Sequence, residues 1–301
     1  VEGMRALSGG EMWGIPVVNV INVLLYNKDL FDRFGVEYPK DGLTWEEAAE
    51  LSRLMTRVDE GEQYVGLYAE QGHVMRTNQF SLPYIALDAF ESNLGKNELW
   101  AKVLDAMFVM PGASDGYKEF MRNERQGNTP GKYNLVNDQK LAMYVGLIST
   151  IFTSDMDGLN WDLTTMPVFE ELPEIGSQPY PIYFSVTKTS EHKEAAIKVI
   201  KYLVSEEMQL RNSKRGDVPV LMNESVQQAF AQHSPYKDKN WAAVFAHEPA
   251  PMSLKNRYDS IVEQEIRKVL PQIILGEIDM NTAIRTADDA ANQRLKAEAV
   301  Q

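Results

Sequence analysis

The chain contains no cysteine among its 301 residues. Disulfide frameworks, thiolate zinc sites and cysteine nucleophiles are therefore excluded. Histidine is scarce too, and the four present form no H-x-x-x-H or H-E-x-x-H pattern: His73, His192, His233 and His247. We therefore expect no structural metal and no cofactor. His247 and the adjacent Glu248 are interpreted as a surface pair.

Basic residues are also fewer than acidic ones: the chain has 30 Lys and Arg and 43 Asp and Glu, which gives a net charge of -13. This balance does not support nucleic-acid binding or attraction to an anionic membrane. Long apolar runs are missing as well. The run over residues 15–25 is interrupted by Asn19 and Asn22 and falls short of the roughly 20 residues that a transmembrane helix needs.

Enzyme signatures are absent. There is no G-x-G-x-x-G and no G-x-x-x-x-G-K segment. Residues 112–116 (GASDG) resemble a serine nucleophile elbow, but a predicted helix precedes them where an elbow needs a strand, so we expect a turn. No pair of carboxylates stands out as a glycosidase pair. The sequence therefore favours a binding protein over an enzyme.

What is present is an ordinary globular composition, 44% hydrophobic, over a length that suits about two domains. Short β-like runs alternate with amphipathic helices, which indicates an α/β fold. The expected strands are 13–26, 140–145, 161–168 and 182–188. The expected helices are 27–34, 44–54, 79–90, 98–109, 114–125, 193–204, 258–275 and 280–297.

Several local signals support these ranges. Thr44 and Glu47 form the pattern of a capping box. Thr189 or Ser190 is expected to cap the helix 193–204, and Pro271 should kink or split the helix 258–275. We expect the first three strands to share one sheet that the helices starting at Thr44 and Gln79 cover.

Four segments of the chain carry distinctive motifs. They are WGIP, LLYNKDLF and TWEE at 13–16, 24–31 and 44–47; NDQKLAMYVG at 137–146; SEHKEAA at 190–196; and RGDVPV at 215–220. Taken together, these segments resemble the family of solute-binding proteins to which maltose-binding protein belongs, and their order and spacing agree along nearly the whole chain. Gln139 stands where the family usually has glycine.

The resemblance implies a periplasmic-binding-protein-like α/β fold, with two lobes joined by crossing strands. Residues 23–183 with 250–301 would form the second lobe, and residues 1–22 with 184–249 the remaining part of the first. In the family, the G-x-P strand follows several βα units, so the first lobe is expected to be incomplete by roughly 100 residues. A signal peptide and a lipid-anchor cysteine would lie in that missing part, and the location would be extracytoplasmic.

The resemblance also implies a function. The chain is expected to be the receptor of an ABC importer, to capture a carbohydrate or oligosaccharide between its lobes, and to deliver it to the transmembrane subunits of the permease. Another small solute, such as a peptide or a polyamine, is an alternative. A carbohydrate-active enzyme is a less favoured one.

Sugar sites combine aromatic faces with amide and carboxylate groups, and this chemistry selects the candidate ligand-binding residues. They are Trp13, Asn19, Asn22, Gln79, Tyr84 and Trp241. Hydrogen bonds within the hinge would equally explain Asn19 and Asn22. Packing is the favoured interpretation for Trp13, and packing in the core is the favoured one for Tyr84. Trp241 could reach the cleft or the lobe surface.

Overall fold

The computed structural model describes residues 4–5, 9–123 and 130–299. Its main element is a five-stranded sheet in the order β3-β4-β5-β2-β6. β4 and β5 are parallel, and the other neighbouring strands are antiparallel. The strands are β2 (Asn22–Asn27), β3 (Arg57–Asp59), β4 (Glu62–Ala69), β5 (Leu141–Leu147) and β6 (Trp161–Thr165).

The predicted shared sheet is confirmed. β2 is buried at every position, because it lies between β5 and β6; Leu24, for example, pairs with Val145 on one side and Thr164 on the other. The predicted run 13–26 is two strands, since pairing breaks between β1 (Ile15–Val18) and β2. Gln139 takes a left-handed φ of 54°, the conformation that glycine adopts most readily, at the turn before β5.

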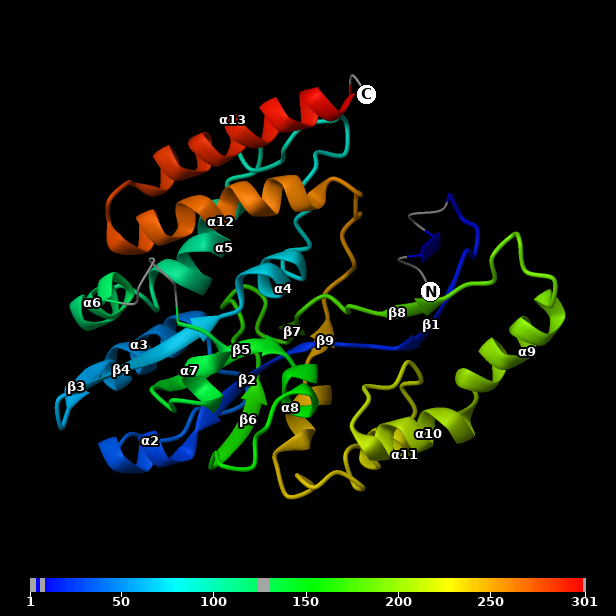
Figure 1. The fold of residues 1–301 in the computed structure, drawn as a ribbon, viewed down its shortest axis with the longest axis horizontal. Coiled ribbons are helices and arrows are strands. Elements are labelled where there is room, and N and C mark those ends of the chain that lie inside the picture. The colour runs from blue at the N-terminus through cyan, green and yellow to red at the C-terminus, as the bar shows by residue number, and fades with distance from the viewer. Residues whose placement is uncertain (1–3, 6–8, 124–129, 300–301) are drawn as a thin grey trace.

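Helices pack on both sides of this sheet (Figure 1). They are α2 (Lys28–Phe34), α3 (Trp45–Met55), α4 (Gln71–Arg76), α5 (Leu99–Leu104), which continues as the π-helix η1 (Asp105–Val109), α6 (Asp115–Asn123), α7 (Lys132–Val136) and α8 (Ser149–Thr153). The capping box of Thr44 and Glu47 is formed at the start of α3. The predicted helix 114–125 agrees over the described residues, and its last two positions lie outside them.

The predicted helix 79–90 is wrong. The helix of this region is α4, which ends at Arg76, and the chain then runs irregularly to Glu98. The side chain of Asn78 bonds to the main chain of Met75 and Leu82, while Gln79 donates to the carbonyls of Pro167 and Ile175. These bonds hold the backbone in a non-helical path, so α3 covers the sheet without a helix starting at Gln79.

A second group of elements lies beside the sheet, on the right of Figure 1. β1 pairs with β8 (Ile182–Phe184), which is shorter than predicted. Three helices follow: α9 (Lys193–Leu203), α10 (Glu206–Arg215) and α11 (Glu224–Gln228). α9 is a helix as predicted, but no side chain caps it at His192. Of its side chains only Ile200 is buried, whereas Val199 and Tyr202 are exposed.

The chain crosses between the two groups three times. Residues 19–21 join β1 to β2, and residues 177–181 join β7 (Ile175–Gly176) to β8. The third crossing runs from η2 (Trp241–Phe245) through β9 (Glu248–Pro249), which pairs with β7, to α12. η2, expected in the first lobe, packs against β6. The lobe boundaries stay a prediction.

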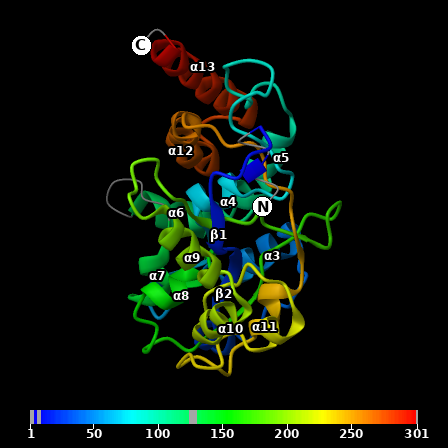
Figure 2. The same ribbon diagram turned by 90° about the vertical axis from the view of Figure 1, so that its right-hand side faces the viewer.

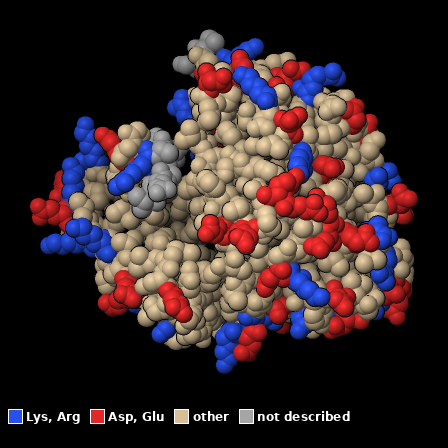
Figure 3. Space-filling view, turned by 180° about the vertical axis from the view of Figure 1, so that it is seen from behind, with Lys and Arg blue, Asp and Glu red and all other residues tan. Residues whose placement is uncertain are grey.

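The chain ends in an antiparallel helix pair, α12 (Asp259–Leu275) and α13 (Met280–Ala299), which lies at the top of the molecule in Figure 2. Pro271 does not split α12, which continues to a left-handed Gly276 cap. Viewed from behind, the narrow α9 side with its Lys and Arg cluster is separated by a hollow from the broad body (Figure 3). No helix among the described residues has the length and apolar character required to cross a membrane.

Candidate functional site

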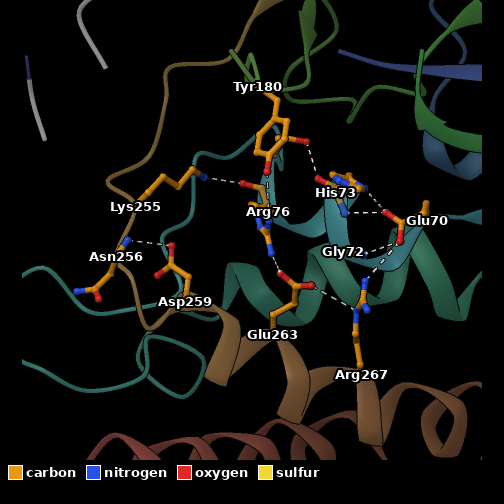
Figure 4. Close-up of polar contacts among 11 residues, drawn as sticks. Glu70, Gly72, His73, Arg76, Tyr180, Lys255, Asn256, Asp259, Glu263 and Arg267 are labelled. Carbon is orange, nitrogen blue, oxygen red and sulfur yellow. Dashed lines mark hydrogen bonds and ion pairs between the residues drawn. The ribbon is translucent and has the colours of Figure 1, made fainter. Parts of the chain in front are cut away.

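The ends of β4 and β5 place a group of polar side chains at one edge of the main sheet. Because these two strands are parallel, their carboxyl ends meet at the same edge, where ligands of open α/β sheets bind. β4 ends at Ala69, and Glu70 and helix α4 follow directly. Helix α12 starts close by and faces α4, so both helices contribute side chains (Figure 4).

Six of these side chains form a closed ring of polar and aromatic contacts, which we call the α4–α12 ring. Its members are Glu70, His73, Arg76, Tyr180, Glu263 and Arg267. Glu70 lies 2.7 Å from Nδ1 of His73 and 3.4 Å from Arg267. Arg267 reaches Glu263 at 3.4 Å, and Glu263 pairs with Arg76.

Tyr180 closes the α4–α12 ring. Arg76 donates to its hydroxyl at 3.4 Å, and its aromatic ring meets that of His73 edge to face at 5.7 Å. Burial alone would raise the pKa of Glu70, but hydrogen bonds from the His73 ring and from the N–H groups of His73 and Gly72 lower it to about 2. Glu70 is therefore a carboxylate at neutral pH, and the ring is a charged frame that joins α4 to α12.

A cavity of about 350 Å³ opens beside this frame, and we call it the solute cavity. Its volume falls within the range of about 300–1,000 Å³ that is common for small-molecule sites. Its wall is made by residues of α4, of the second crossing with β8, and of the start of α12: Arg76, Pro179, Tyr180, Pro181, Tyr183, Met252, Lys255, Asn256, Arg257, Asp259 and Ser260.

Two buried polar atoms in this wall have no hydrogen-bond partner among the described residues. One is Oδ1 of Asp259, whose other oxygen accepts from the N–H of Asn256 at 3.0 Å. The other is the hydroxyl of Tyr183. Burial raises the pKa of Asp259 and of Tyr183. A carboxyl oxygen and a phenol that are both unpartnered suit a ligand that carries hydroxyl groups.

Lys255 fixes the loop before α12. Its Nζ donates to the carbonyl of Arg76 at 2.6 Å, to Oγ of Ser253 at 2.7 Å and to Oε1 of Gln178 at 3.2 Å. Because the group is buried, the pKa of Lys255 falls to about 8. The ammonium thus positions three segments that form the cavity wall.

The structure places the sequence-predicted residues away from the solute cavity. Asn19 and Asn22 line a second cavity of about 60 Å³ between the three crossings, which we call the hinge cavity. Trp13 is 61% exposed in a separate hollow, which Phe184 also lines. Contact with a ligand stays a prediction for all of them.

The remaining three candidates are buried and have internal partners. Gln79 accepts from the indole of Trp45, and Tyr84 stacks on Trp100 at 5.2 Å. Trp241 packs among Phe152, Trp161 and Phe230. The surface interpretation of His247 is wrong, because its Nε2 is buried in the wall of the hinge cavity while Glu248 is exposed.

Sequence reasoning missed Glu70, Arg76, Tyr183, Lys255 and Asp259. The sequence did carry a signal for Glu70. This acidic residue directly follows a strand, β4, and ligands of open α/β sheets bind at the carboxyl ends of strands. No signal existed for the others, because they come from segments that are far apart in the chain; Arg76 and Lys255, for example, are 179 positions apart. Among the described residues, no group of three or more histidine or acidic side chains could hold a metal ion.

The model of one family, described as bacterial extracellular solute-binding protein, matches residues 1–210. Solved structures with a similar fold include an ABC substrate-binding protein from Listeria monocytogenes in complex with cycloalternan, with 17% identity and a TM-score of 0.72 over 98% of this chain and 75% of that one. A sugar transporter from Rhizobium etli in an open conformation shows 16% identity and a TM-score of 0.71 over 95% and 75%.

The sugar-binding protein MalE from Xanthomonas citri is also similar, with 19% identity and a TM-score of 0.60 over 96% of this chain and 72% of that one. No curated protein matches the chain. At these identities the structural likeness shows the fold, which is that of the solute-binding proteins.

Proposed function

Because the chain belongs to the bacterial extracellular solute-binding proteins, we propose that it is the extracytoplasmic receptor of an ABC importer and captures a carbohydrate in the solute cavity. The observation that carries the proposal is the pair of buried, unpartnered polar atoms in that cavity, Asp259 Oδ1 and the Tyr183 hydroxyl. A carbohydrate hydroxyl both donates and accepts, so it can satisfy each of them.

The aromatic rings support the same ligand class. Tyr180 and Tyr183 both line the solute cavity and offer faces on which the C–H surface of a sugar packs. Arg76 adds a fixed cation, held in place by Glu263. Several similar structures are named for sugar ligands, among them mannotriose and D-mannitol. The partner of the loaded receptor would be the transmembrane part of an ABC permease.

Capture in such a site is binding without chemical change. The walls come from the two groups of elements, since Tyr183 lies in β8 and Asp259 in α12. Rotation about the three crossings would bring these walls onto the solute and exclude water. The solute would leave unchanged when the walls separate.

Isothermal titration against a panel of mono- and oligosaccharides tests the proposal. A sugar that binds should lose about tenfold or more in affinity in Asp259→Asn, which keeps the side-chain size and removes the charge. Tyr180→Ala should also weaken binding, whereas Tyr133→Ala, at a 65% exposed tyrosine, should not. Products in the recovered sugar, or equal affinity in all variants, would refute the proposal.

A further inference from the structure

The hinge cavity lies apart from the solute cavity, and no lining residue is shared between them. All three crossings contribute to it: Asn19 to Asn22 from the first, Ser177 from the second, and the segment from Ala243 to Pro249 from the third. Much of the remaining wall is apolar, with Met166, Val218 and Met222. Its volume of about 60 Å³ is far below that of common small-molecule sites.

Asn22 lines this cavity and has an unpartnered side-chain oxygen, and the orientation of its amide is fixed. Oγ1 of Thr77 donates its single proton to the carbonyl of His73 at 2.7 Å. It can therefore only accept from Asn22, whose Nδ2 lies 2.7 Å away. The second atom of the amide, the one not bonded to Thr77, must then be Oδ1 of Asn22. It is buried and has no partner among the described residues.

His247 contributes a second atom of this kind. Its Nε2 is buried and has no partner in the described part of the chain. Burial lowers the pKa of His247, while Asp41 and Glu174 act in the opposite direction. A neutral imidazole bears one N–H, so Nε2 needs a donor in one tautomer and an acceptor in the other.

Ser177 supplies a third polar group. Its hydroxyl oxygen accepts from the main-chain N–H of Asn22 at 3.2 Å, which leaves the hydroxyl proton available to donate. A metal ion does not suit this wall, because no carboxylate lines the cavity. Water does suit it, since a buried water makes about three hydrogen bonds and can serve as donor and acceptor at once.

We propose that the hinge cavity is a hydration site in which ordered water bridges Asn22 Oδ1, His247 Nε2 and the hydroxyl of Ser177. The water adds to the backbone contacts that already join the crossings, which are the bond from the Tyr180 N–H to the Val20 carbonyl at 2.9 Å and the pairing of β7 with β9. It also extends the hydrogen-bonded series that runs from Asn22 through Thr77 to the carbonyl of His73 in the α4–α12 ring. The inference does not depend on which solute the chain binds.

A crystal structure that resolves ordered water tests the proposal on the unmodified chain. Density for one or more waters is expected within about 2.7–3.2 Å of Asn22 Oδ1 and His247 Nε2. A dry cavity, or a side-chain arrangement in which protein groups satisfy both atoms directly, would overturn it.

Two variants provide a second readout. His247→Phe removes the ring nitrogen and fills the space, so the bridging water should disappear and the melting temperature should fall by about 2 °C. Met222→Leu changes the same wall without a polar group and should keep both the water and the melting temperature. Retention of the water in the same position in His247→Phe would show that His247 does not hold it.

Discussion

Arg76 and Glu263 form an ion pair that joins α4 to α12 in the α4–α12 ring. The two residues are 187 positions apart in the chain. The side chain of Glu263 is 9% exposed, so its charge depends on Arg76 and on the longer contact with Arg267. The pair thus connects the helix that follows β4 to the first turns of the helix that begins at the solute cavity.

Replacement of Arg76 by methionine should lower the free energy of unfolding by about 2–3 kcal/mol, because it leaves a buried carboxylate with one distant cation. Urea titration measures the change. Arg53→Met is the matched control, since Arg53 pairs with Glu50 on the exposed surface of α3 and should cost less than about 0.5 kcal/mol. Equal effects of the two variants would contradict the structural role of the Arg76–Glu263 pair.

The stability of the chain should respond to the titration of Lys255. Burial lowers its pKa from 10.5 to about 8 in the folded chain. The unfolded chain then binds more protons between these values, so this group makes the fold more stable as the pH rises from 8 to 10.5. The difference in unfolding free energy between Lys255→Met and the unmodified chain should therefore change across this window. A difference that stays constant from pH 8 to pH 10.5 would contradict the burial of the Lys255 ammonium.

Gly66 should not tolerate a side chain. A Cβ at this position of β4 would lie 2.2 Å from the carbonyl oxygen of Ser52 and 2.3 Å from its Cα, both on the backbone of α3. Gly66→Ala must therefore move the helix away from the sheet, and we expect a loss of about 1–3 kcal/mol in denaturant unfolding. Gly158→Ala meets no atom within 4 Å and should change stability by less than about 0.5 kcal/mol. A neutral Gly66→Ala would mean that α3 lies farther from β4.

The apolar surface of β1, β8 and α9 should drive self-association. Trp13, Phe184 and Ile197 share one hollow and are 61%, 47% and 46% exposed. Among the described residues, neither strand of this sheet has a further strand beside it. Analytical ultracentrifugation should show association that increases with concentration and weakens in Trp13→Ser/Phe184→Ser. Leu87→Ser, at a 72% exposed loop residue, is the control. A monomer at every concentration would contradict this expectation.

Local signals in the sequence determined much of the secondary structure. The capping box of Thr44 and Glu47 and the left-handed cap at Gly276 act within one helical turn, so their residues suffice to predict them. The apolar residues 23–26 predicted a strand, and the structure buries that strand, β2, between β5 and β6. The motifs that resemble the solute-binding proteins predicted the family for the same reason: they lie in contiguous segments.

Tertiary structure decided the rest. The region after Gln79 has helical periodicity, but hydrogen bonds from Gln79 to Pro167 and Ile175, about 90 residues away, hold it in an irregular path. The solute cavity likewise joins Arg76, Tyr183 and Asp259 from three distant segments. Periodicity and spacing describe interactions between near neighbours in the chain. A polar site between separate elements depends on which polar side chains are buried next to one another. Only the packing of the whole chain determines which side chains these are.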